Sequence, residues 1–184
     1  MDRRTPRRLL LWFASIAHAA LPPVVVSGAT GRVGSAVVKA LVARRGSAEG
    51  IFVLARDAAK AAAMHDVPCL SATYDDEEAL AAAFASVPAG FRLFLACSNG
   101  PEQAALESSV CRAAQSGGCS FIVKLSTASP LLEVEQGEVK QGMSAAHLQV
   151  ERLLAELQVP HAVLRPNLFI DEVCFGGLLG VGGA

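Results

Sequence analysis

The sequence predicts an α/β protein with a doubly wound, parallel sheet of about six strands and helices on both faces. Three observations support this fold class. Short apolar segments alternate with longer helical ones through most of the 184 residues, which is the order of parallel βαβ units. The first apolar segment ends in a glycine-rich turn that leads directly into a helix. A hydrophobic fraction of 52% supplies a core for one domain.

The glycine-rich turn is the most informative stretch of the chain. In VVVSGATGRVG a β-branched run precedes Gly28, Gly31 and Gly34, and a helix is predicted over residues 32–45, closed by Gly46. The first glycine allows a sharp turn, the second lets backbone N–H groups approach a phosphate, and the third lets the helix pack closely on the strand. Because a helix N-terminus attracts anions, this order predicts a binding site for the pyrophosphate of a dinucleotide.

The elements that follow continue the alternation of strand and helix. Further strands are predicted at residues 51–55, 69–72, 91–97, 121–126 and 161–164. Helices are predicted at residues 57–64, 101–115 and 144–157, with another that begins at Asp75 or Asp76. Asp57 suits the N-cap of the first of these helices. The strands are so uniformly apolar that they are expected to be buried on both faces of the sheet.

Composition and charge exclude several functional classes. The formal net charge is −1, so no global field favours nucleic acid or an anionic membrane. The cysteines are odd in number and contain no C-x-x-C pair, which argues against a disulfide framework and a zinc site. They are interpreted as small buried side chains in a reducing compartment. His18, His65 and His161 are scattered, so no metal site is predicted and these side chains are interpreted as structural or exposed.

Both ends of the chain differ from the predicted domain at residues 24–173. Residues 1–23 join an Arg-rich start to a short apolar run, a pattern that resembles a secretory signal or an organelle transit peptide. An untargeted extension is the alternative, and the protein is expected in the cytoplasm or an organelle rather than outside the cell. The glycine-rich tail at residues 174–184 is expected to be flexible.

Five segments, taken in order, carry a resemblance to a known family. They are SGATGRVGSAVVKAL, VLARDAAKA, FLACS, VKLSTAS and HLQVERLLAELQVPHAVLRPNLFIDEV. Together they resemble the NmrA-like branch of the atypical short-chain dehydrogenase/reductases, and the resemblance implies an NAD(P)-binding Rossmann domain. Relatives usually continue well past this point and complete their substrate pocket there. The chain is therefore expected to be C-terminally truncated, or to bind nucleotide without the usual substrate recognition.

The end of the second predicted strand bears on the choice between NAD(H) and NADP(H). NAD-preferring sites commonly carry an acid there that binds the ribose, whereas this strand is followed by Arg56. A guanidinium suits a 2′-phosphate, and Arg32 in the glycine turn is placed to add a second contact. NADP(H) is therefore preferred to NAD(H). The alternative is a solvated Arg56 that pairs with Asp57.

The resemblance also implies which other residues lie beside the cofactor. Relatives usually have an aspartate near the adenine, shortly after the third strand. Thr73 occupies that position here, and Asp75 or Asp76 is the alternative. Residues that end the fourth and fifth strands are expected beside the cofactor, the latter near the nicotinamide. The predicted cofactor-binding residues are Gly28, Ala29, Thr30, Gly31, Arg32, Val33, Gly34, Arg56, Thr73, Cys97, Ser98, Lys124 and Ser126.

The candidate catalytic residues are His147 and Glu151. Ordinary short-chain dehydrogenases use a Tyr-x-x-x-Lys pair, but the single tyrosine, Tyr74, lies in another segment, so that mechanism is not predicted. His147 and Glu151 form an i, i+4 pair on one face of the late helix, and some NmrA-like reductases share this H-x-x-x-E pattern. His147 is the candidate proton donor, oriented by Glu151. A surface ion pair or a contribution to packing is the alternative.

Two functions follow from these observations. The first is an NADPH-dependent reductase of a small electrophile such as a quinone or a conjugated carbonyl, favoured by the H-x-x-x-E pair. The second is a catalytically inactive, NADP-sensing regulator that acts through a protein partner, favoured by the missing tyrosine and the short C-terminal part. Neither function involves nucleic acid or stable membrane insertion. The polar stretch at residues 129–141 follows the fifth strand and is expected to be a substrate loop.

Overall fold

The computed structural model describes residues 21–128 and 143–167, and within them six strands form one parallel sheet in the order β3-β2-β1-β4-β5-β6. The strands are β1 (Val24–Ser27), β2 (Ile51–Ala55), β3 (Cys69–Ser71), β4 (Arg92–Leu95), β5 (Phe121–Leu125) and β6 (His161–Leu164). The helices are α2 (Arg32–Arg45), α3 (Ala58–Met64), α4 (Glu77–Ala85), α5 (Gln103–Ser116) and α7 (Met143–Glu156). The doubly wound α/β fold is confirmed.

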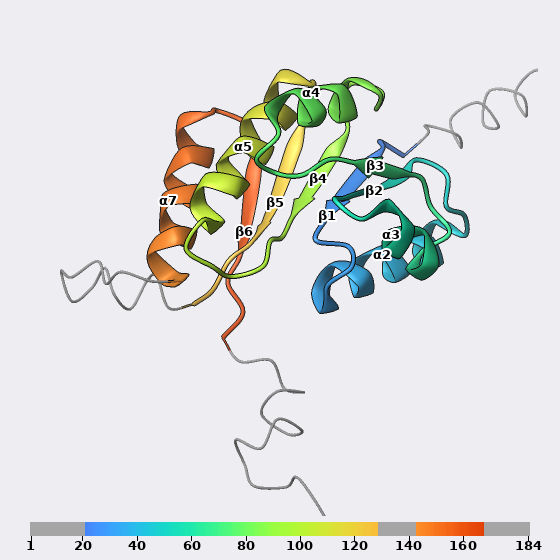
Figure 1. Cartoon of the computed structure of the whole chain (residues 1–184), viewed down its shortest axis with the longest axis horizontal. Helices are drawn as coiled ribbons and strands as arrows, with labels where there is room; N and C mark the ends of the chain where they lie inside the picture. Colours follow the sequence, from blue (N-terminus) through green and yellow to red (C-terminus); the bar gives the residue numbers. More distant parts are fainter. Residues whose placement is uncertain (1–20, 129–142, 168–184) are drawn as a thin grey trace, which may run out of the picture.

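Helices cover both faces of the sheet (Figure 1). Apolar residues of α4, α5 and α7 pack with Val25, Leu54 and Ile122 in the larger core cluster. Residues of α2 and α3 pack with the alternate strand positions, among them Val26 and Val53, in a second cluster. Successive strand residues point to opposite faces. The apolar runs in β1 and β2 therefore contribute side chains to both core clusters.

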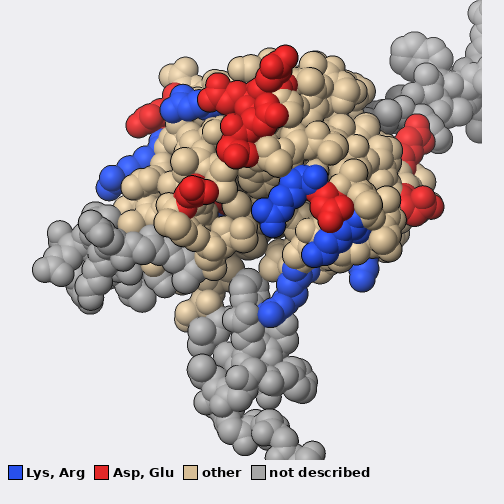
Figure 2. All heavy atoms as spheres, viewed as in Figure 1, with Lys and Arg blue, Asp and Glu red and all other residues tan. Residues whose placement is uncertain are grey.

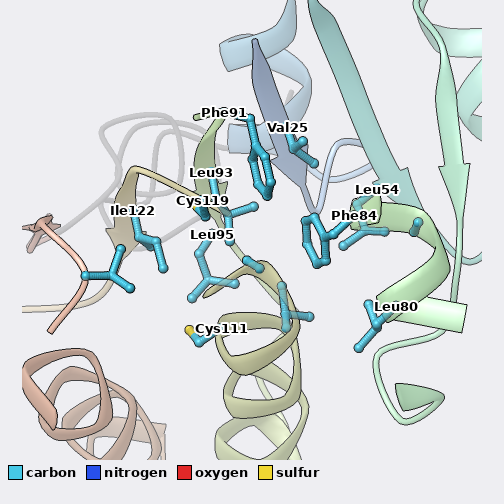
Figure 3. Packing of buried hydrophobic residues seen from close by; sticks show 14 of the residues in the cluster. Val25, Leu54, Leu80, Phe84, Phe91, Leu93, Leu95, Cys111, Cys119 and Ile122 are labelled. Carbon is cyan, nitrogen blue, oxygen red and sulfur yellow. The ribbon is translucent and has the colours of Figure 1, made fainter. Parts of the chain in front are cut away.

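The larger core contains a stacked aromatic pair and two of the free cysteines. The rings of Phe84 and Phe91 lie with their centroids 5.4 Å apart and their planes 5° from parallel. Figure 3 shows both rings beside Val25, with Cys111 and Cys119 in the same cluster. Burial raises the pKa of both thiols. All four cysteines that the structure describes are free, and Cys174 lies outside the described residues.

Local signals placed the helix ends correctly. The carboxylate of Asp57 accepts a hydrogen bond of 2.8 Å from the N–H of Lys60 and caps α3. Of the two alternatives for α4, Asp76 is the N-cap and accepts a bond of 2.9 Å from the N–H of Ala79. Gly46 ends α2 in the left-handed conformation, with a φ of 72°. These caps depend on short-range chemistry, which a sequence displays directly.

Two expectations about the strands need correction. β4 ends at Leu95, earlier than predicted, because the N–H of Ala96 is bonded to the hydroxyl of Ser27, at 2.9 Å, and not to a neighbouring strand. Burial on both faces holds for β1 and β2 but not for β5 and β6. β6 is the edge of the described sheet, and Leu164 is 48% exposed.

Several predictions concern residues that the structure does not describe. They include the apolar run before residue 21, the loop at residues 129–141 and the tail at residues 174–184. The described helices are all too short or too polar to cross a membrane. The described part of the chain also contains no group of three or more His, Cys, Asp or Glu side chains able to hold a metal ion.

Candidate nucleotide-binding site

The turn between β1 and α2 requires glycine at two of its three glycine positions. Gly28 has a φ of +62°, and a Cβ placed there would lie 2.8 Å from the carbonyl oxygen of Ala96. A Cβ on Gly34 would lie only 2.2 Å from the carbonyl oxygen of Gly28. The N–H of Gly31 donates to that same oxygen at 2.9 Å and closes the turn. The first and third glycines therefore let strand, turn and helix approach as closely as the motif predicted.

The N-terminus of α2 opens the cleft to an anion. Gly31 is the N-cap residue and supplies no side-chain cap. The first backbone N–H groups of a helix have no partner within it, and the helix dipole makes this end positive. Gly31, Arg32 and Val33 line the cleft, so the turn presents the chemistry that a diphosphate needs.

Three side chains form hydrogen bonds in the turn or directly beside it. The hydroxyl of Ser27 donates to the carbonyl of Ala96 at 2.9 Å. The Nε2 atom of His65 lies 2.9 Å from the carbonyl oxygen of Ala29. The hydroxyl of Tyr74 accepts a 3.0 Å bond from the N–H of Gly28. His65 is therefore structural, as expected, whereas the role of Tyr74 was not predicted.

The turn forms one wall of a cleft of about 850 Å³. The sheet order changes direction between β1 and β4, and the cleft lies beyond the carboxyl ends of these strands, where open α/β sheets bind ligands. Besides the turn, the lining comes from the ends of β2, β4 and β5, from α3, α5 and α7, and from residues after β3 and β6. The lining residues outside residues 28–34 are Leu54, Ala55, Arg56, Asp57, Lys60, Tyr74, Ala96, Cys97, Ser98, Asn99, Leu106, Leu125, Ser126, Thr127, His147, Pro166 and Asn167.

Three cationic side chains line the cleft: Arg32, Arg56 and Lys60. Figure 2 shows Lys and Arg side chains gathered on the part of the surface that carries α2 and α3, with Asp and Glu concentrated near α4. Arg56 directly follows β2, while Asp57 is engaged as the cap of α3. Lys60 was missed by the sequence analysis, although its position one helical turn after Arg56 was a usable signal.

A buried polar network lies behind the cleft between α5, β5 and α7. The side chain of Lys124 is completely buried, and its Nζ atom lies 2.9 Å from Oε1 of Glu107, which is also completely buried. The same Nζ lies 3.0 Å from Nδ1 of His147 and donates to the carbonyl of Leu125. The amide nitrogen of Gln103 lies 3.2 Å from Nδ1 of His147 and 3.3 Å from its Nε2. Glu107 and Gln103 were missed because their role depends on helix packing.

The network sets the charge state of His147. Burial and, secondly, the ammonium of Lys124 lower the pKa of His147, Glu151 acts in the opposite direction, and the resulting pKa is about 4. Burial also raises the pKa of Glu107, while Lys124 opposes that change. His147 is consequently a neutral imidazole near pH 7.

Glu151 does not orient His147 by a direct hydrogen bond. Its carboxylate accepts 2.5 Å bonds from the hydroxyl of Ser126 and from Nη2 of Arg165. Burial by itself would raise the pKa of Glu151, but the bonds from Arg165 and Ser126 bring it below its usual value. Glu151 therefore joins the ends of β5 and β6 to α7. Its ionised form is stabilised by these partners.

Most predicted cofactor-binding residues meet at the cleft, and three predicted site residues do not. Thr73 is exposed outside the lining, and the next residue, Tyr74, lines the cleft in its place. Lys124 shares the buried face of β5 with Ile122 and lies behind the cleft wall. Glu151 lies beside the lining residue Ser126. The predicted residues that line the cleft are Gly28, Ala29, Thr30, Gly31, Arg32, Val33, Gly34, Arg56, Cys97, Ser98, Ser126 and His147.

Comparisons with solved structures find the same fold in known reductases. Triphenylmethane reductase from Citrobacter sp., solved as a complex with NADP(H), is 24% identical, with a TM-score of 0.69 over 85% of this chain and 53% of that one. An NADPH-dependent quinone oxidoreductase from Escherichia coli, solved with NADPH, is 27% identical, with a TM-score of 0.64 over 77% of this chain and 48% of that one. The chain thus spans about half the length of these neighbours.

The match to a family model identifies the group to which the chain belongs. A search of curated proteins finds no match. The model for NAD(P)H-binding proteins matches residues 28–178, a range that includes the glycine turn and all the lining residues named above. The expected NAD(P)-binding Rossmann domain and the resemblance to NmrA-like proteins are confirmed, while the neighbours lend no support to the regulatory alternative. The chain is a member of the NAD(P)H-binding family.

Proposed function

We propose that this chain binds NADP(H) in the cleft and acts in a reductase that transfers hydride to a small electrophile, such as a quinone or a conjugated carbonyl. The observation that carries the proposal is the glycine cradle at the N-terminus of α2, flanked by the cations Arg32, Arg56 and Lys60. The quinone oxidoreductase among the neighbours uses NADPH, which supports both the cofactor and the acceptor class.

The residues present fit a phosphorylated dinucleotide. The N-terminus of α2 would hold the pyrophosphate, because its N–H groups and dipole stabilise negative charge. Arg56 would hold the 2′-phosphate, since its guanidinium forms bidentate bonds with phosphate oxygens. Lys60, one turn along α3, adds a second positive charge to the same wall of the cleft. The positive charge of this wall favours NADP(H) over NAD(H), because only NADP(H) carries the additional 2′-phosphate.

The opposite wall of the cleft offers groups for the reacting end. Leu125, Ser126, Thr127 and His147 line it. The nicotinamide supplies hydride chemistry when bound, and the protein orients the acceptor against it. His147 carries the one imidazole among the described lining residues, and in its neutral form it donates a hydrogen bond to an acceptor oxygen. Ser126 is fixed by its bond to Glu151 and shapes the same wall.

Calorimetric titration of the full chain with NADPH and with NADH tests the cofactor assignment. We expect tighter binding of NADPH by about 10-fold or more, the value of one charge-assisted contact. Arg56→Ser should remove most of that difference, whereas the same change at Arg112, an exposed arginine of α5 outside the lining, should leave it intact. Equal affinity for the two nucleotides would contradict NADP(H) selectivity, and no binding of either would contradict the whole proposal.

A second assay tests the reaction. NADPH oxidation is followed with a panel of quinones and conjugated carbonyls. Turnover with at least one acceptor is expected, and it should be lost in Arg56→Ser at low NADPH and regained at high NADPH. NADPH binding without turnover of any acceptor would contradict the reductase function and favour the regulatory alternative.

A further inference from the structure

We propose that Lys124 is a positioning residue that fixes the proton of His147 on Nε2, so that the site presents a hydrogen-bond donor to the acceptor oxygen of the substrate. The inference deepens the proposed reductase function and rests on it. It also gives a role to a buried ion pair that the nucleotide site does not use.

The ammonium of Lys124 lies at Nδ1 of His147. An ammonium group has donors and no acceptor, and the Nζ atom of Lys124 lies 3.0 Å from Nδ1. Since an ammonium can only donate, Nδ1 must accept this hydrogen bond and cannot carry a proton. The amide nitrogen of Gln103 lies 3.2 Å from Nδ1 and 3.3 Å from Nε2, so it does not distinguish the two ring nitrogens. In a neutral imidazole the proton then belongs to Nε2.

Lys124 is held in this position by its other partners. Its ammonium has three N–H donors, and three acceptors surround it: Oε1 of Glu107 at 2.9 Å, Nδ1 of His147 and the carbonyl oxygen of Leu125. Both Lys124 and Glu107 are completely buried. An ammonium whose three donors are all engaged does not swing toward the cleft, so its effect reaches the cleft through His147.

Charged side chains from three elements surround His147. Glu107 comes from α5, Lys124 from β5 and Glu151 from α7 itself. Glu151 is engaged by Ser126 and Arg165, while Glu107 neutralises Lys124. Burial and Lys124 together disfavour protonation of the ring. His147 is 7% exposed and lines the cleft. Its Nε2–H group can consequently donate a hydrogen bond to a molecule in the cleft without transferring the proton.

This arrangement selects among acceptors. Hydride transfer from NADPH to a quinone or an enone would break a C–H bond of the reduced nicotinamide, form a C–H bond in the acceptor and move an electron pair to the acceptor oxygen, which becomes anionic. The Nε2–H group stabilises that oxyanion by a hydrogen bond, and water supplies the proton that completes the product. The site therefore suits acceptors whose reduced anions are stabilised by conjugation. Simple aldehydes and ketones, whose alkoxides need an acid in the transition state, should be poor substrates.

Nuclear magnetic resonance of the full chain with ¹⁵N-labelled histidine tests the tautomer directly. The ring signals of His147 are assigned by their loss in His147→Gln, and His161 serves as an internal reference. We expect the Nε2–H form at about pH 7 and no titration of His147 above about pH 5. An Nδ1–H form, or titration near the ordinary histidine value, would overturn the proposal whether or not the protein proves to be a reductase.

The variant that removes Lys124 must also remove the charge of Glu107, because a lone buried carboxylate compromises folding. The double variant Lys124→Met with Glu107→Gln is therefore used, and circular dichroism checks its fold. We expect the His147 pKa to rise by about one unit or more and the Nδ1–H form to appear. Unchanged ring signals in the folded double variant would show that Lys124 does not position the proton. If this variant does not fold, the ring signals of the unaltered chain decide, because an Nδ1–H form beside the ammonium of Lys124 contradicts the positioning role.

Kinetics of the same double variant test the catalytic consequence. We expect kcat with quinones to fall about 10- to 100-fold, the usual loss for one oxyanion contact, while the Kd for NADPH stays unchanged. An unchanged kcat in the folded variant would contradict the positioning role. If NADPH binds but no acceptor is turned over, the reductase proposal fails, and the resonance measurements still decide the state of His147.

Discussion

A side chain on Gly34 would collide with the backbone of Gly28, because its Cβ would lie 2.2 Å from that carbonyl oxygen. The two residues belong to α2 and to the turn after β1, so their contact sets the distance between helix and strand. No flexible side chain is available to move, and the backbone itself would have to shift. Of the three glycines of the motif, Gly34 is therefore the one at which an added Cβ would lie closest to another atom, followed by Gly28 and then Gly31.

Gly34→Ala should both destabilise the protein and abolish tight NADPH binding. Overpacking of this kind costs about 1–3 kcal/mol, and the displaced turn would misalign the N–H groups at the start of α2. Urea unfolding and calorimetry measure the two effects. Gly90→Ala is a useful contrast: its φ of +84° brings strain, but no atom lies within 4 Å of the added Cβ. Equal NADPH affinity in Gly34→Ala and the wild type would contradict the role of the close packing.

Tyr74→Phe should weaken NADPH binding without removing the aromatic ring from the cleft. The substitution leaves the N–H of Gly28 without its 3.0 Å partner, at a cost of about 1 kcal/mol in stability and a several-fold loss of affinity. Thr73→Ala is the matched control, since Thr73 is exposed and outside the lining. A larger effect from Thr73→Ala than from Tyr74→Phe would restore the original expectation that Thr73 contacts the cofactor.

Lys124→Met should be far more damaging than the double change with Glu107→Gln. The single substitution leaves a buried carboxylate unpaired, which costs about 3–5 kcal/mol, whereas neutral replacement of a whole buried pair costs little or is stabilising. Arg165→Met disrupts a partly exposed pair with Glu151 and should cost about 1 kcal/mol or less. Denaturant unfolding of all three variants checks the order. A single variant as stable as the double would indicate that Glu107 finds another partner or a proton.

His147 should make the protein sensitive to acid. Its folded pKa of about 4 lies below the ordinary 6.5, so the unfolded chain binds the proton first as the pH falls. The free energy of unfolding is therefore unaffected by this group above about pH 6.5, and it decreases progressively as the pH falls from about 6.5 to about 4. The expected loss is about 3 kcal/mol. Urea unfolding of wild type and His147→Gln across this range isolates the effect, because Glu107 and Glu151 titrate in both proteins. Parallel curves would show that the pKa is not depressed.

The parts of the site that could be predicted are those fixed by neighbours in sequence. Gly28 and Gly34 follow from the motif, and the cap at Asp57 follows from the chemistry of a helix start. The partners of Lys124 were not accessible, because Glu107 reaches it only when α5 packs on β5. Glu151 illustrates the same limit: its i, i+4 spacing pointed to His147, but the register of β5 with β6 brings Arg165 to it.

Tyr74 and Thr73 show how finely the side-chain direction depends on tertiary structure. Both follow β3 directly, and a sequence pattern cannot tell which of two adjacent residues turns inward as the chain leaves the sheet. Tyr74 is the residue that turns inward, because its hydroxyl accepts a hydrogen bond from Gly28 and its ring is partly buried against the core. Burial raises the pKa of this hydroxyl, which keeps it protonated and suited to a structural contact with the turn.

The hydroxyl of Ser27 bonds to both the N–H and the carbonyl of Ala96, each at 2.9 Å, where the two halves of the sheet meet. A side chain thereby extends the pairing of β1 and β4 one step beyond the last backbone ladder. The amide hydrogen of Ala96 should for this reason exchange with deuterated solvent as slowly as those of the central strands, requiring global rather than local opening. The seam between β1 and β4 should then open only together with the rest of the sheet.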